Sequence, residues 1–171
     1  LMNDLHELGF QAITMQQMAD FMERNAMIPP RSVLLIVDDR HFPEYFDDHF
    51  RPFHERWGWP VVNAYIAKDE RPDLWAANAG LSAEGWVDYQ SHGVIHNINI
   101  TGASDEAYML SELQGAIDNI RKYMNKTPIA YIWPGGSFTP RAAQIAREPG
   151  HKLGFTAHPS GTGMPNWVPL A

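Results

Sequence analysis

Short continuous apolar runs recur along the chain and predict five strands. The first run, residues 33–37, consists of aliphatic side chains and leads into two aspartates. A run of this kind is typical of a strand buried on both faces of a parallel sheet, because a half-exposed strand would alternate apolar and polar residues. The other four predicted strands span residues 61–66, 86–90, 127–133 and 152–157.

Apolar residues spaced three and four apart predict two helices before the first strand. Residues 1–8 carry leucines at this spacing, and Gly9 follows where a left-handed C-terminal cap would lie. Thr14 and Gln17 form the capping-box pattern, so we expect a second helix from there to about Asn25.

The same spacing predicts three helices between the strands. The first has one apolar face, the second begins at Ser104, and the third has Thr139 as its N-cap with Pro140 at the first position. The segment between the second and third strands is rich in Ala, Asn and Gly, and we expect it to be a loop. The inward positions of the first two helices are Phe46, Phe50, Phe53 and Trp57, and Leu110, Leu113, Ile117 and Ile120.

Strands that alternate with helices indicate parallel pairing with right-handed crossovers, in a doubly wound sheet or a β/α barrel. In both folds the functional residues lie at the C-terminal ends of the strands. We therefore expect one edge of the sheet to carry the site. The residues that end the predicted strands there are Asp38, Asp39, Ser91, His92, Pro134, Gly135, Gly136 and His158.

Two histidines, His92 and His96, have a spacing that lets both imidazoles bind one ion. On its own this pair also fits ordinary surface or hydrogen-bonded histidines, since the chain has 8 of them. With one carboxylate of the pair 38–39 it makes a three-ligand site with open positions, as a hydrolytic metal requires. The other aspartate would then be close enough to act as a base, although either aspartate also fits a helix N-cap.

Two other classes of site use these residue types. A receiver domain of two-component signalling also has an acidic pair after its first strand. It needs further catalytic residues at later strand ends, where this chain has Ser91, His92 and the sequence WPGG. An iron oxygenase uses two histidines and one carboxylate, but in double-stranded β-helix folds, which the alternation of strands and helices disfavours.

Composition and charge narrow the classes of partner and site that the chain could have. The 171 residues, 44% of them apolar, suffice for one domain with a sizeable core. The net charge of -7 disfavours a nucleic acid or an anionic membrane as partner, because both need a basic surface. With no cysteine, any metal site must use His, Asp and Glu. No stretch approaches the roughly 20 apolar residues of a membrane span, and the helical start leads us to expect a fragment of a longer chain.

Three segments resemble, in order and spacing, the motifs of the polysaccharide deacetylase family, the NodB-like carbohydrate esterases of family 4: LLIVDDRH, VDYQSHGVIHN and YIWPGGSFTPRAAQIAREPGHKLGFTAHP. The resemblance is strongest to deacetylases of the exopolysaccharide poly-N-acetylglucosamine. It implies that residues 1–171 form an α/β deacetylase domain, an incomplete (distorted) β/α barrel of parallel strands. It also implies one divalent ion, zinc first with cobalt, nickel or iron as alternatives, and an N- or O-acetylated polysaccharide or oligosaccharide as substrate.

The resemblance also implies roles for single residues. The family's acidic motif falls on the end of the first strand, which makes Asp38 the catalytic base and Asp39 a metal ligand. Its H-S/T-x-x-H motif falls on His92 and His96, two further ligands, with Gly93 in the Ser/Thr place.

The family's R-x-P-Y-G motif falls on residues 132–136, and this chain departs from it twice. Gly135 replaces the tyrosine, but its backbone N–H can still stabilise an oxyanion, so we expect it to take part in catalysis. Ile132 replaces the arginine that tethers the base, a loss that would raise the pKa of Asp38 while the metal would lower it. Arg40 is a candidate for the missing cation.

The family's last motifs have only candidate counterparts. His158 is a candidate general acid and Trp167 a candidate groove wall; otherwise both are ordinary loop residues and the acid lies beyond residue 171. Trp133 and Trp167 would offer flat faces to sugar rings or else pack in the core. The substrate class implies an extracellular, periplasmic or cell-envelope location. The alternative function is a degenerate domain that binds carbohydrate without turnover.

Overall fold

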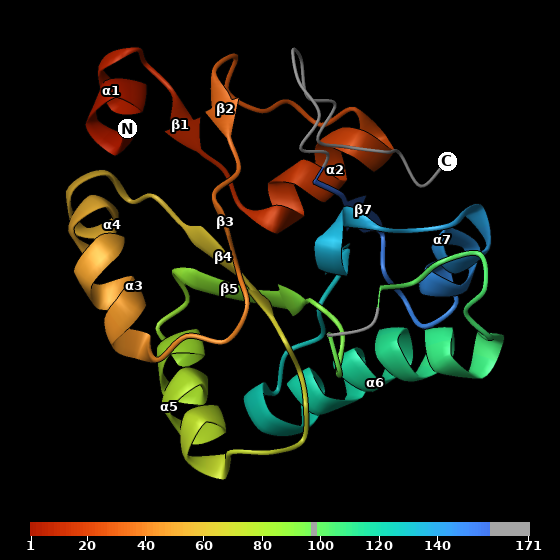
Figure 1. Cartoon of the computed structure of the whole chain (residues 1–171). Coiled ribbons are helices and arrows are strands. Elements are labelled where there is room, and N and C mark those ends of the chain that lie inside the picture. The colour runs from red at the N-terminus through yellow and green to blue at the C-terminus, as the bar shows by residue number, and fades with distance from the viewer. Residues whose placement is uncertain (97–98, 158–171) are drawn as a thin grey trace.

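Five parallel strands form a curled sheet in the computed structural model, which describes residues 1–96 and 99–157 (Figure 1). The strands lie in the order β3-β4-β5-β6-β7, so each strand pairs with the next one along the chain. The sheet closes only half of a barrel, which confirms the predicted α/β fold of the incomplete β/α-barrel type. The strands are β3 Ile36–Asp38, β4 Val61–Tyr65, β5 Val87–Ser91, β6 Ala130–Ile132 and β7 Leu153–Phe155.

Helices connect these strands, and two short strands, β1 Gln11–Ala12 and β2 Ser32–Val33, pair in a small parallel sheet of their own. The capping box predicted at Thr14 and Gln17 is present, as is the Thr139 N-cap. The helices are α1 Met2–Glu7, α2 Met15–Arg24, α3 Pro43–His49, α4 Arg51–Trp57, α5 Pro72–Ala83, α6 Glu106–Met124 and α7 Pro140–Arg147. None of the helices in the described ranges is long and apolar enough to cross a membrane.

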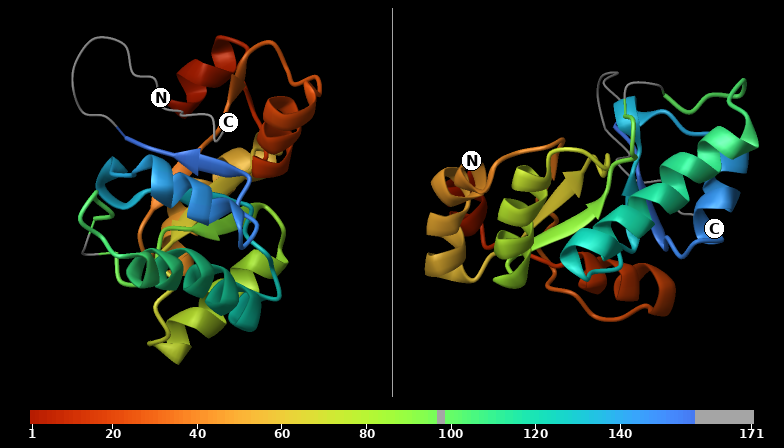
Figure 2. Two further views of the ribbon diagram at one scale, coloured as in Figure 1. Left: turned by 90° about the vertical axis from the view of Figure 1, so that its right-hand side faces the viewer. Right: turned by 90° about the horizontal axis from the view of Figure 1, so that it is seen from below.

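Helices cover both faces of the sheet (Figure 2). The alternation of side chains along a strand assigns each strand residue to one face. Val61 and Tyr65 of β4 belong to the core formed with α3, α5 and α6. Val62 and Ala64 point the other way and pack with Met15 of α2. A strand with two buried faces explains the continuous apolar runs in the sequence.

A buried glutamine joins β5 to β6 where their backbones share a single paired position, between Ser91 and Tyr131. Gln90 is 1% exposed, and its side-chain oxygen accepts hydrogen bonds of 2.8 Å from the backbone N–H groups of both Ile129 and Ala130. The side chain of Gln90 thus replaces backbone hydrogen bonds that β5 and β6 do not form with each other here, because buried backbone N–H groups require a partner.

The first predicted strand, residues 33–37, differs from expectation. It is divided between β2 and β3, and its residues are half-buried instead of buried on both faces. The division arises because Ser32 and Val33 pair with β1, whereas Ile36 begins the edge strand of the large sheet. An edge strand has a neighbour on one side only, which leaves part of its surface open.

The segment expected to be a loop between the second and third strands is the helix α5. Pro72 lies at its start, where proline is favoured, and alanine is the strongest helix former. The amphipathic pattern is interrupted by Asn78, which is fully buried and hydrogen-bonds to the hydroxyl of Tyr89 at 2.6 Å. That partner comes from a distant strand, so the buried face could not be read from spacing alone.

Two other helices differ in detail. The helix expected from Phe46 to Trp57 breaks at Phe50, because Pro52 lacks the N–H that would continue the hydrogen-bond ladder. The long helix α6 has Asp105 as its N-cap instead of Ser104. Its inward positions also shift by one residue near the start. Leu110 is 36% exposed and Met109 is buried in its place, while Leu113, Ile117 and Ile120 face the core as expected.

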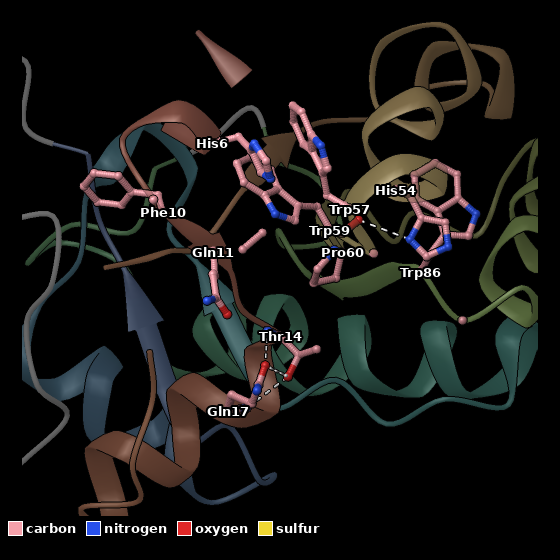
Figure 3. Close-up of a pocket in the computed structure, with 14 residues that line it drawn as sticks. His6, Phe10, Gln11, Thr14, Gln17, His54, Trp57, Trp59, Pro60 and Trp86 are labelled. Atoms are coloured by element: carbon pink, nitrogen blue, oxygen red, sulfur yellow. Dashed lines mark hydrogen bonds between the residues drawn. The ribbon is translucent and has the colours of Figure 1, made fainter. Parts of the chain in front are cut away.

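An aromatic cavity of about 650 Å³ lies at the opposite, N-terminal ends of the strands, between Pro60 and Trp86 (Figure 3). Its rings stack on one another. The ring centroids of His6 and Trp57 lie 4.0 Å apart with an interplanar angle of 5°, and those of His54 and Trp86 lie 5.1 Å apart. The faces of these rings are therefore largely occupied by the protein itself.

Candidate metal centre

Polar residues gather at the C-terminal edge of the sheet, where the strand pattern places them. Asp38 is the last residue of β3, and Asp39 follows it. His92 follows β5, and the 3-10 turn Pro134–Gly136 follows β6. Because the strands are parallel and in sequential order, their C-terminal ends meet at one edge.

Asp39, His92 and His96 come together at this edge, as a group that could hold a metal ion. One ligand atom of each lies within 4.8 Å of the others. Asp39 Oδ1 lies 3.7 Å from His92 Nε2 and 3.4 Å from His96 Nε2. Two imidazole nitrogens and a carboxylate oxygen at these separations match a three-ligand zinc site that keeps coordination positions open.

The environment of His92 leaves the correct nitrogen free for a metal. The residue is 2% exposed, and its Nδ1 lies 2.8 Å from the carbonyl oxygen of Ile132, so Nδ1–H donates this bond. The lone pair then resides on Nε2, which faces Asp39. Burial lowers the pKa of His92 and outweighs the opposing effects of the hydrogen bond and of Asp38, so the neutral, ligating form is favoured.

Two of the three clustered residues adopt left-handed backbone conformations. Asp39 has φ of 74° and His96 has φ of 67°. A non-glycine residue in this region costs on the order of 1–3 kcal/mol, and it persists only where the surroundings hold it. The backbone at Asp39 and His96 therefore stores strain at the edge that carries the candidate site.

A buried acid that the sequence analysis did not single out, Glu112, supports the turn of the second histidine. It is 1% exposed on α6, and its carboxylate accepts hydrogen bonds from the backbone N–H groups of Val94, Ile95 and His96. The sequence signal that could have identified Glu112 is a charged residue on the inward face of α6, one place before Leu113.

Asp38 borders a cavity of about 320 Å³ that also includes Gly135 and Gly136. Asp38 is exposed, and none of the ion pairs among residues 1–96 and 99–157 involves it. A carboxylate beside the candidate ligands and open to a cavity has the placement that a base requires. Its role, like those of the other candidate residues, stays a prediction.

Arg40 does not replace the family arginine. Its guanidinium donates to the carbonyl oxygens of Ile66 and Lys68 and forms an ion pair of 2.9 Å with Glu70. These partners belong to the loop after β4, so the expectation that Arg40 is the cationic partner of Asp38 is wrong. The backbone at the preceding residue, Asp39, is left-handed, which the sequence pattern did not predict.

The glycine in the family's tyrosine position has a structural reason. Gly135 has φ of 60°, and a Cβ placed on it would lie 2.8 Å from the side-chain nitrogen of Asn99. Asn99 thus occupies the space beside Gly135. Trp133 is 3% exposed and packs in a core cluster, although it borders the cavity. The candidates His158 and Trp167 lie outside the described residues.

Comparisons with known proteins identify a family for most of the chain. The profile of the polysaccharide deacetylase family matches residues 28–154. A comparison with curated protein sequences found no match.

Solved structures with the same fold include two deacetylases and a third protein, IcaB. Streptococcus pyogenes deacetylase PplD is 20% identical with a TM-score of 0.75, and 91% of this chain aligns with 69% of that one. The BpsB deacetylase domain from Bordetella bronchiseptica is 22% identical with a TM-score of 0.73, over 92% of this chain and 77% of that one. IcaB from Ammonifex degensii is 19% identical with a TM-score of 0.76, over 91% and 72%.

Proposed function

The chain belongs to the polysaccharide deacetylase family, and we propose that it is a metal-dependent hydrolase that removes acetyl groups from a polysaccharide. The observation that carries this proposal is the convergence of Asp39, His92 and His96 within 4.8 Å, beside Asp38 and a cavity. The fold that the chain shares with two solved deacetylases is consistent with this proposal.

The residues at the cluster fit a divalent ion, and zinc is our first choice. Two neutral imidazoles and one carboxylate are the donor set of many catalytic zinc sites, and cobalt, nickel and iron accept the same ligands. The Nδ1–H bond of His92 to a backbone carbonyl is the outer contact that ligating histidines commonly make. When bound, such an ion supplies Lewis acidity toward an acetyl carbonyl and a water molecule.

Asp38 takes the role of general base in this proposal. It is next to Asp39 in the chain, and its carboxylate borders the cavity into which an acetyl group would enter. It would accept a proton from the attacking water. Without the family arginine, Asp38 has no ion pair with a lysine or arginine among the described residues, so its carboxylate stays open to the cavity.

Gly135 takes the role of oxyanion donor through its backbone N–H. The residue borders the same cavity as Asp38, so both groups can face one acetyl group. We further propose His158 as the acid that protonates the departing amine or alcohol of the sugar.

The net charge of -7 favours a neutral or cationic glycan, such as a polymer of N-acetylated sugars that gains amino groups as it is deacetylated. A substrate of this kind lies outside the cytoplasm, and we propose an extracellular, periplasmic or cell-envelope location.

The test is acetate release from N-acetylated chito-oligosaccharides by the zinc-loaded chain. We expect Asp38→Asn to lower kcat by on the order of 10²- to 10⁴-fold, the usual effect of losing a general base, while about one zinc per chain stays bound. Asp118→Asn, the same change at an exposed position of α6, serves as the control and should leave kcat unchanged.

Two results would contradict the proposal. The first is an Asp38→Asn variant as active as the wild type, which would remove Asp38 from the mechanism. The second is a wild type that binds zinc and oligosaccharide but releases no acetate, which would favour the degenerate carbohydrate-binding domain.

A further inference from the structure

We propose that Glu112 is a positioning residue for the metal centre: its buried carboxylate sets the conformation of residues 92–96 and so brings His96 to Asp39. This inference rests on the proposed metal-dependent function. Glu112 touches neither the cavity beside Asp38 nor the ligand atoms, so it would act through the backbone of the loop.

The carboxylate of Glu112 accepts hydrogen bonds from three consecutive backbone N–H groups. Oε2 accepts from Val94 N at 2.9 Å and from His96 N at 3.4 Å, and Oε1 accepts from Ile95 N at 2.9 Å. Three consecutive N–H groups that converge on one carboxylate form an anion-binding nest. Hydrogen bonds to a carboxylate are about twice as strong as neutral ones, and a buried carboxylate requires such partners. The carboxylate and the turn therefore stabilise each other.

The turn depends on this support because its backbone is not in a favoured conformation. It leaves β5 at Ser91, passes Gly93 with φ of 79°, and reaches His96 with φ of 67°. The N–H group of His92 still donates to the carbonyl oxygen of Tyr65 in β4. Residues 94–96 belong to no helix or strand, so their N–H groups have no ladder to join. If Glu112 were absent, we expect His96 to relax toward the common right-handed or extended regions. His96 Nε2 would then move away from Asp39 Oδ1, which now lies 3.4 Å from it.

Gly93 makes room for the carboxylate. A Cβ at this position would lie 2.6 Å from Glu112 Oε2 and 3.1 Å from the hydroxyl of Tyr131. The glycine that stands in the family's Ser/Thr place is thus matched to Glu112, because no other residue would fit while the carboxylate keeps its position.

The experiment combines zinc affinity with amide hydrogen exchange. We expect Glu112→Gln to weaken zinc binding by on the order of 10- to 100-fold, which is the usual effect of losing a residue that orients a metal ligand. Glu112→Asp keeps the charge but is shorter, and it should fall between the wild type and Glu112→Gln. Glu106→Gln is the matched control. It makes the same change on the same helix, at an exposed residue paired with Arg141, and should bind zinc as the wild type does.

Hydrogen exchange of the metal-free wild type tests the loop without any substitution. The amides of residues 94–96 should be protected before zinc is added, and Glu112→Gln should reduce that protection while α6 keeps its own. This measurement also decides the matter if Glu112→Gln fails to fold. Protection of all three amides in the folded, metal-free wild type supports the proposal, and exchange at the rate of an open loop overturns it.

The outcomes separate this inference from the proposed function. A folded Glu112→Gln variant that binds zinc within twofold of the wild type would overturn the positioning role, leaving Glu112 a purely structural residue. A wild type that binds zinc but releases no acetate would contradict the deacetylase function and leave the role of Glu112 standing. A wild type that binds no zinc would contradict the metal centre, and the protection of residues 94–96 would then still report whether Glu112 holds the turn.

Discussion

The two ends of the sheet differ in whether their histidine side chains are packed against other rings or grouped so that they could bind a metal ion. At the N-terminal end, the aromatic cavity of about 650 Å³ is the larger one, yet His6 and His54 are stacked on tryptophans (Figure 3). At the C-terminal end the cavity is about 320 Å³ and is lined in part by Asp38. The candidate ligand atoms of Asp39, His92 and His96 cluster at the same edge of the sheet. Free ligand atoms and an open carboxylate, not the size of a cavity, therefore mark the candidate site.

Backbone strain follows the same division. The described residues include five non-glycine positions with positive φ. Asn25 and Asn125 end helices, where this conformation is common, and Asp39 and His96 belong to the candidate metal site. The fifth, Arg71, precedes α5, so two of the three positions that do not follow a helix lie at the edge where we place the chemistry.

The largest expected effect comes from removing both histidines of the C-terminal edge. His92→Ala combined with His96→Ala should reduce bound zinc from about one per chain to none, because a single carboxylate cannot hold the ion. His6→Ala, which removes a histidine from the aromatic cavity, should leave the zinc content unchanged. Elemental analysis after dialysis measures both. An equal zinc content in the two variants would show that the histidines of the C-terminal edge do not hold the ion.

A buried histidine that is not among the candidate metal ligands should affect stability instead of metal binding. His151 is 2% exposed, both of its ring nitrogens have partners, and burial lowers its pKa to about 4. The unfolded chain takes up this proton near pH 6.5. Between about pH 6.5 and 4 the proton binds more readily to the unfolded chain, so the free energy of unfolding should decrease as the pH falls through this window, by up to about 3 kcal/mol.

Urea unfolding of the metal-free chain at several pH values tests this prediction for His151. His151→Gln cannot take up the proton, so its free energy of unfolding should depend less on pH than that of the wild type. Identical pH dependence in the two proteins would show that His151 is not the group responsible.

The smallest expected effect, and the most selective one, comes from a matched pair of glycines. Gly135 at the C-terminal edge and Gly58 at the N-terminal cavity have φ of 60° and 71°. Alanine at either position should lower stability by about 1 kcal/mol because of the left-handed backbone. Only Gly135→Ala should also lower kcat, since its Cβ would meet Asn99 at 2.8 Å and displace the turn beside the cavity.

Thermal unfolding together with acetate release measures both glycine variants. Loss of kcat in Gly58→Ala as large as in Gly135→Ala would mean that activity reports only general stability, and the comparison between the two ends would fail.

Local sequence determined which segments alternate between helix and strand and where several of them start. The capping pair at Thr14 and Gln17 and the proline after Thr139 act through contacts within one turn, so they can be predicted from sequence alone. The positions of Asp38 and His92 at strand ends also follow from the pattern, because parallel strands place their C-terminal ends on one edge.

Contacts between distant segments decided the rest. The first predicted strand is divided because β1 pairs with Ser32 and Val33. The buried face of α5 includes Asn78, whose partner is the hydroxyl of Tyr89 on β5. Arg40 turns to the loop after β4, and Glu112 meets a turn 16 to 18 residues away in sequence. A pattern of apolar spacing reports which face of an element is buried. The spacing does not identify the polar group that a buried polar side chain will contact, because hydrogen bonds between distant segments form only once the chain is folded.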